Sequence, residues 1–223
     1  MKRTAWKFGT ERKQAAWEGA DTSLWPTVMI FFTMSLAGWL WEVCLHLFTE
    51  GRFVNRGFFH GPWLPIYGAG SVLILIFLRK LRKKPFLEFL SILCLCGGLE
   101  YFISWFLEQL YDGKKWWDYS DYFLNLNGRI CMEGLFAFGI GGMFLVYVLE
   151  PLLGRLFQRI PKKFLMTACL VLLLLFAADL LYSGGNPNMG HGITQGSAQA
   201  LHEREKEGGD KLCLLFIYHP FIL

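Results

Sequence analysis

The chain of 223 residues is 54% hydrophobic, 17% aromatic and only 18% charged, and its mean hydropathy is +0.35. A water-soluble domain of this size cannot bury so much apolar surface, whereas lipid solvates it, so the composition argues against soluble enzymes, disulfide-rich secreted domains and disordered proteins. The net charge of +4 comes from Lys and Arg residues that gather in a few segments, which also argues against a nucleic-acid partner. We therefore expect a membrane protein whose partner is the lipid bilayer.

Five apolar runs approach the length of about 20 helical residues that is needed to cross about 30 Å of hydrocarbon. They predict an all-α fold, a polytopic bundle of about five transmembrane helices. The second run is short, and its Pro62 and Pro65 predict a tilted or irregular entry into the membrane. The five predicted spans are 24–48, 62–78, 86–111, 130–150 and 164–183.

The Lys and Arg residues orient these spans. The N-terminal tail and the segments after the second and fourth spans contain 14 of them, and the three alternate segments contain 8. Because cytoplasmic segments are enriched in Lys and Arg, we expect the N-terminus in the cytoplasm. The predicted parts are a basic cytoplasmic tail at 1–23, a membrane domain at 24–183 and an extracytoplasmic tail at 184–223.

Four of the acidic residues within the predicted spans are singled out as candidates: Glu42, Glu100, Glu133 and Asp179. An ionisable group inside a bilayer costs roughly 2.5 to 3.5 kcal/mol on insertion scales, so each needs a partner or a water-filled cavity. At about 1.5 Å per residue all four lie in the outer half of the membrane, with Glu100 deepest. They are candidate residues for binding a substrate or an ion, in a polar cavity that opens away from the cytoplasm.

Helical spacing predicts that small and polar residues share one face on three of the spans. Two local interpretations stay open: Arg129 and Glu133, at positions i and i+4, form an ion pair, and His46 neutralises Glu42. The predicted faces are Ser35, Gly38, Glu42 and His46 on the first span, Cys96, Glu100, Ser104 and Glu108 on the third, and Arg129, Glu133, Ala137 and Gly141 on the fourth.

Searches for catalytic and cofactor motifs are negative. The sequence contains no GxxxxGK[ST] loop, no HExxH motif and no GxSxG elbow, and its five His residues lack metal-ligand spacing. Most of the six Cys residues lie in or beside apolar runs, where a free Cys behaves as a small hydrophobe. We predict no metal and no cofactor, and the sequence indicates no enzymatic activity.

Three stretches carry a family resemblance: GWLWEV at 38–43, GFFHGPWLPIYGAG at 57–70 and WWDYSDYFLNLNGRICMEG at 116–134. Together they resemble the bacterial integral membrane family called putative ABC-transporter type IV, over about residues 30–183. His60 departs from the aromatic residue expected there. The resemblance implies a multi-pass protein of the bacterial plasma membrane, and it implies importance for Glu42, Pro62, Tyr67, Glu100, Trp117, Asp118, Tyr119, Asn127, Gly128, Arg129 and Glu133.

The outer loop and the helix entry have roles that follow from their residue types. Asn127 and Gly128 form a strong turn signal that places Arg129 at the start of the fourth span, where Asp118 is positioned to cap or bond to the turn. Pro62 and Pro65, with Tyr67 after them, permit a sharp entry into the second span.

The leading interpretation is a transport component, a permease-like subunit that works with a separate ATPase. Five spans are few for a complete pathway, so we expect a homo- or hetero-oligomer. The short cytoplasmic connections argue against this reading, since only 151–163 has the length of a small coupling helix. The alternatives are a proton- or cation-coupled carrier, and a membrane sensor or assembly factor with an outward-facing polar cavity.

Overall fold

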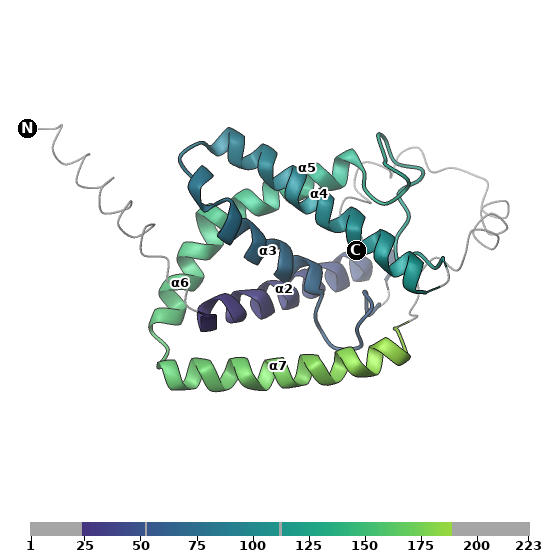
Figure 1. Cartoon of the computed structure of the whole chain (residues 1–223). Coiled ribbons are helices and arrows are strands. Elements are labelled where there is room, and N and C mark those ends of the chain that lie inside the picture. Colours follow the sequence, from purple (N-terminus) through teal and green to yellow (C-terminus); the bar gives the residue numbers. More distant parts are fainter. Residues whose placement is uncertain (1–23, 52, 112, 189–223) are drawn as a thin grey trace, which may run out of the picture.

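The computed structural model describes residues 24–51, 53–111 and 113–188, and in these ranges the regular structure is helical (Figure 1). The tail at 1–23 and the tail beyond residue 188 lie outside the described residues. The elements in chain order are α2 (Leu24–Glu50), α3 (Pro65–Phe77), a 3₁₀ turn η1 (Arg79–Leu81), α4 (Pro85–Leu110), α5 (Met132–Phe144), a π-helical turn η2 (Leu145–Leu149), α6 (Glu150–Gln158) and α7 (Lys162–Gly185).

The predicted all-α membrane fold is confirmed for these ranges, with four helices long and apolar enough to cross a bilayer. The second predicted span, 62–78, forms the shorter helix α3, whose 13 residues extend only about 20 Å. Helix α3 begins at Pro65 because proline has no backbone N–H to donate and its φ already suits the first helical turn. Pro62 lies in the preceding loop and is exposed.

The short helix α3 lies between α2 and α4, while α5 packs on α4 and α7 packs on α2 (Figure 1). Two glycines allow α2 and α3 to approach closely. Gly38 of α2 lies against the ring of Tyr67, and Gly68 of α3 lies against Ser35 and the backbone of Phe31. A Cβ at either glycine would overlap these neighbours, so this contact requires the small residue.

The fourth predicted span extends beyond its expected end at residue 150. Helix α5, the π-helical turn η2 and helix α6 follow one another without a break from Met132 to Gln158. A π-helical turn inserts one extra residue into an α-helix and marks functional sites in many proteins. Only residues 159–161 separate α6 from α7, so most of the predicted connection at 151–163 is itself helical.

The apolar core lies where α3, α4 and η2 meet, around Ile74, Ile92 and Val146. A second cluster, formed by Trp116, Trp117, Tyr119 and Cys131, holds the loop between α4 and α5. The five described cysteines are free, which confirms for them the interpretation as unpaired side chains: Cys44, Cys94, Cys96, Cys131 and Cys169.

Candidate functional site

The polar face predicted for the first span points into the bundle. Ser35, Gly38, Glu42 and His46 are all buried on α2. The Tyr67 hydroxyl of α3 donates a hydrogen bond to Glu42 Oε1 at 2.8 Å. The Nδ1 atom of His46 lies 2.8 Å from the backbone carbonyl oxygen of Glu42, so the ring also bonds to the main chain of the same helix.

The predicted face on α4 is confirmed for Cys96, Glu100 and Ser104, which are buried. Glu100 is only 1% exposed, and its Oε1 atom accepts a hydrogen bond from the Tyr119 hydroxyl at 3.2 Å. Its other oxygen, Oε2, is buried and has no hydrogen-bond partner among the described residues. Since nearly all buried polar atoms in proteins are hydrogen-bonded, this oxygen marks a place for a further donor or cation.

A tight turn positions Tyr119. Asn127 and Gly128 have φ values of 56° and 68°, as in a type I′ turn, which confirms the predicted turn. The carbonyl oxygen of Gly128 accepts a hydrogen bond from the Tyr119 backbone N–H at 2.7 Å. The Trp117 indole N–H donates to the Arg129 carbonyl oxygen at 3.0 Å, which fixes the other side of the loop.

Burial and the nearby Glu100 raise the pKa of Tyr119 well above its usual value of 10. Tyr119 therefore keeps its proton at neutral pH and remains a hydrogen-bond donor to the carboxylate. The side chain is only 2% exposed although it belongs to a loop. The loop between α4 and α5, here named the aromatic loop, thus contributes directly to the interior of the bundle.

Glu42, Tyr67, Glu100 and Tyr119 form one group, here named the carboxylate–tyrosine cluster. Hydrogen bonds join Tyr67 to Glu42 and Tyr119 to Glu100, and the first pair is close enough to the second to raise the pKa of Tyr119. Arg56 lies in the loop before α3, is only 4% exposed, and is near enough to Tyr67 to interact with it electrostatically. Sequence reasoning missed Arg56, although it is a cation that shortly precedes the aromatic residues Phe58 and Phe59.

A small cavity of about 120 Å³ adjoins the cluster. Tyr67 and Ser71 of α3, Cys96 of α4, and Ala137 and Phe138 of α5 are among the residues that line it. At about 30 Å³ per water molecule it has room for about four waters. Tyr67 of the cluster therefore borders a small, mostly apolar space between α3, α4 and α5.

The predicted face on the fourth span is wrong, because α5 begins only at Met132. Arg129 lies in the turn before the helix, and its Nη2 atom pairs with Glu108 Oε2 of α4 at 2.6 Å. Glu133 and Gly141 are exposed, so the predicted Arg129–Glu133 pair is replaced by a contact between α4 and the outer loop. The buried residues of α5 are Gly134, Gly139 and Gly142.

Asp179 lies near the C-terminal end of α7 and accepts hydrogen bonds from four donors. Its Oδ1 atom accepts from the His60 N–H at 3.2 Å and from the Ser183 hydroxyl at 2.9 Å. Its Oδ2 atom accepts from the Gly61 N–H at 2.9 Å and from the Trp63 indole N–H at 2.6 Å. The structure places Asp179 away from the cluster, where it holds the loop before α3 against α7.

The remaining outer-loop candidate is Asp118. Its Oδ1 atom accepts hydrogen bonds from the backbone N–H and the hydroxyl of Ser120 and lies against Gly128, and its Oδ2 atom is 3.9 Å from Lys115 Nζ. This contact agrees with the predicted position of Asp118 beside the turn. Its role is to shape the loop that delivers Tyr119.

A second buried carboxylate lies at the other end of α4. Glu88 is fully buried, and its Oε2 atom is 2.7 Å from the hydroxyl of Tyr147, which belongs to the π-helical turn. Arg82 Nη1 lies 3.6 Å from Glu150 Oε2 beside it. Sequence reasoning missed this group, although Glu88 precedes Glu100 by twelve residues and so continues the same face of α4.

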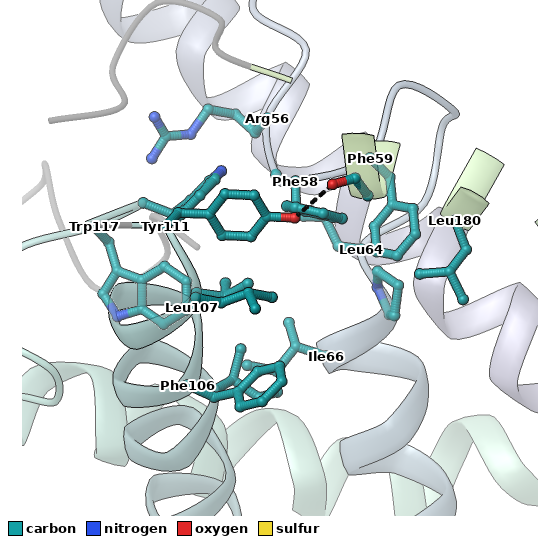
Figure 2. A pocket seen from close by; sticks show the side chains of 16 residues that line it. Arg56, Phe58, Phe59, Leu64, Ile66, Phe106, Leu107, Tyr111, Trp117 and Leu180 are labelled. Carbon is teal, nitrogen blue, oxygen red and sulfur yellow. Dashed lines mark hydrogen bonds between the residues drawn. The ribbon is translucent and has the colours of Figure 1, made fainter. Parts of the chain in front are cut away.

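A larger cavity of about 350 Å³ lies at the end of the bundle where α4 and α7 end (Figure 2). Its walls come from the loop before α3, the last turns of α4, the aromatic loop and the end of α7. The Tyr111 hydroxyl donates to the Gly184 carbonyl oxygen at 3.2 Å, as the dashed line in Figure 2 shows, and this bond joins the ends of α4 and α7.

The family model described as "Putative ABC-transporter type IV" matches residues 29–184. The chain belongs to this family. No curated protein and no solved structure matches the chain. The matched segment runs from α2 to the end of α7, so the ABC-transporter type IV match includes the whole carboxylate–tyrosine cluster and both cavities.

Membership of the ABC-transporter type IV family agrees with the four helices that are long and apolar enough to cross a membrane. The chain is therefore a membrane protein related by family to ABC transporters. The match begins five residues after the start of α2 and ends one residue before the end of α7, so it covers nearly all of the helical part of the chain that the structure describes.

Proposed function

We propose that this chain is a permease-like subunit of a transport system in the bacterial plasma membrane, and that it works with a separate ATPase. Family membership supports a relation to ABC transporters. The sequence contains no P-loop, so ATP hydrolysis is assigned to another polypeptide. The small number of spans supports assembly into a homo- or hetero-oligomer.

The observation that carries the proposal is the half-satisfied carboxylate of Glu100. Its Oε1 atom has Tyr119 as donor, whereas Oε2 is buried without a partner among the described residues. A buried oxygen without a hydrogen-bond partner destabilises a membrane protein unless a donor or a cation compensates it. We assign Glu100 and the neighbouring Glu42 to binding a cationic group of a substrate or a coupling ion.

Helix α6 is the surface that we assign to the ATPase. It exposes Leu152 and Leu156, and Arg155 lies between them on the sequence. The Arg82–Glu150 contact connects the start of α6 to the basic turn after α3. The positive-inside rule puts this basic turn, and with it α6, on the cytoplasmic side, where an ATPase must lie.

Purification of the tagged full-length protein from its native membrane tests the assignment. We expect an ABC-type ATPase, identified by mass spectrometry, to copurify with the wild-type protein and with a Gln158→Glu control. A Leu156→Glu variant, which adds the same charge to the apolar surface of α6, should lose that ATPase. Purification without any ATPase, from a membrane in which the chain supports growth, would contradict the proposal.

A second candidate is a proton- or cation-coupled carrier, which the buried carboxylates also support. Proteoliposomes that contain this chain alone separate the two functions. A carrier would take up protons under an imposed pH gradient, as a trapped pH-sensitive dye reports, and Glu100→Gln would abolish the signal while the exposed Glu133→Gln kept it. An ATPase-dependent subunit would show no uptake in any of the three proteins.

A further inference from the structure

The larger cavity is lined almost entirely by carbon atoms and has one charged side chain, Arg56, at one end. Figure 2 shows Arg56 at one end of the cavity, and Phe106 and Ile66 at the opposite end. Along α4, Ile103 and Phe106 lie nearer the middle of the helix, while Tyr111 lies just beyond its last residue. The cavity therefore runs from the outer boundary of the membrane toward its interior, with the cation at the boundary.

Two side chains, Arg56 and Trp116, determine which ligand the outer end of the cavity can bind. Arg56 is the only charged side chain among the described residues that line the cavity. Trp116 also lines it, is only 4% exposed, and has a buried indole N–H with no hydrogen-bond acceptor among the described residues. A buried donor without an acceptor is costly, so an incoming acceptor beside a positive charge gains both contacts.

The inner end has the character of a lipid chain site. Ile66, Ile103 and Leu107 form its wall, and carbon atoms make up nearly all of the cavity surface. Phe106 and Leu110 also line the cavity and remain about half exposed, as residues that face lipid do. The opening is therefore continuous with the lipid-facing surface of α4.

We propose that this cavity binds one acyl chain of an anionic phospholipid, with the phosphate at Arg56 and the Trp116 N–H. At about 30 Å³ per water-sized group, 350 Å³ holds about a dozen methylene-sized groups, which suits part of a single chain and not a whole lipid. The position of the cavity also suits a phospholipid, because a phospholipid keeps its phosphate at the membrane interface and its acyl chains in the membrane interior. This binding requires neither transport nor an ATPase.

The test measures lipid binding to the purified full-length protein in a neutral detergent. Phosphatidylglycerol and phosphatidylcholine with identical acyl chains are titrated, and bound lipid is counted by native mass spectrometry. Both lipids carry the phosphate, but only phosphatidylcholine adds a choline cation, which Arg56 repels. We therefore expect the wild-type protein to prefer phosphatidylglycerol by about tenfold. Arg56→Gln should remove the preference, and Arg159→Gln, which loses the same charge at an exposed position outside the cavity, should keep it.

Two further variants keep the test decisive if Arg56→Gln fails to fold. Trp116→Phe retains the ring and removes the N–H, so it should weaken phosphatidylglycerol binding several-fold. Ile103→Trp fills the cavity and should remove both lipids, whereas Ile140→Trp on an exposed face should not. Equal binding of the two lipids to the wild-type protein, an unchanged preference in both Arg56→Gln and Trp116→Phe, or full binding to Ile103→Trp would each overturn the proposal.

Discussion

Asp179 near the end of α7 and Glu100 within α4 are both acids in membrane helices, yet their surroundings differ. Asp179 accepts four hydrogen bonds from the loop before α3 and from its own helix. Glu100 is more deeply buried, and one of its oxygens has no partner among the described residues. If Glu100 binds a ligand as proposed, the number of donors around an acid, and not its depth alone, separates a structural anchor from a binding group.

The largest effect on stability is expected at the anchor. Asp179→Ala removes the acceptor for four donors, and we expect the free energy of unfolding to fall by about 3 kcal/mol because hydrogen bonds to a charged group are strong. Unfolding by SDS titration in mixed micelles measures the change. Glu133→Ala, an exposed acid on α5, is the control and should change stability by less than about 0.5 kcal/mol.

The pairing of Arg129 offers a second test of which acids are structural. Arg129→Gln leaves Glu108 without its cation in a half-buried place, and we expect a loss of about 2 kcal/mol in the same assay. Exchanging the charges, Arg129→Glu with Glu108→Arg, should recover part of that loss. An exchange of Arg129 with Glu133 should recover none, and recovery there would restore the pair predicted from the sequence.

A smaller effect is expected for Tyr119→Phe. The change removes the hydroxyl that donates to Glu100 and keeps the ring packed, so stability should fall by about 1 kcal/mol. Tyr122→Phe is a matched control in the same loop. A loss as large as that of Asp179→Ala would mean that Tyr119 belongs to the structural anchors, which would blur the contrast between the two acids.

The smallest effect on stability, and the largest on function, is expected for Glu100→Gln. Glutamine keeps the shape and an acceptor oxygen for Tyr119, so the free energy of unfolding should stay within about 0.5 kcal/mol of wild type. Growth that depends on the intact gene should nevertheless be lost. A destabilised variant, or one that fully supports growth, would make Glu100 a packing residue like Asp179.

The sequence predicted the helices and two buried faces well, because apolar run length and helical period follow directly from residue order. It failed at Arg129, since a shift of the helix start to Met132 moved this residue off the face that a continuous helix would give it. It placed Asp179 with the other acids because depth along a helix carries no information about which loop folds over it. Donors such as the His60 and Gly61 N–H groups are backbone atoms that no sequence pattern reveals.

The buried carboxylate of Glu88, with its partner Tyr147, shows how much of a site helical periodicity can predict. Its place on the α4 face follows from steps of four residues through Ile92 and Cys96 to Glu100. Its partner Tyr147 does not, because the π-helical turn at Leu145–Leu149 shifts the register of the following residues by one position. The structure shows that the Tyr147 hydroxyl and the Glu88 Oε2 atom lie 2.7 Å apart, which the sequence pattern does not predict.

Helix α7 also bears on how the protein is made. Its mean hydropathy of 2.5 is the highest of the four long helices, and only 11% of its most apolar window is buried by the rest of the chain. So apolar a segment enters a bilayer unaided, and membrane helices associate only after insertion. We therefore expect the packing of α7 on α2, and the closure of the loop onto Asp179, to follow the insertion of α7.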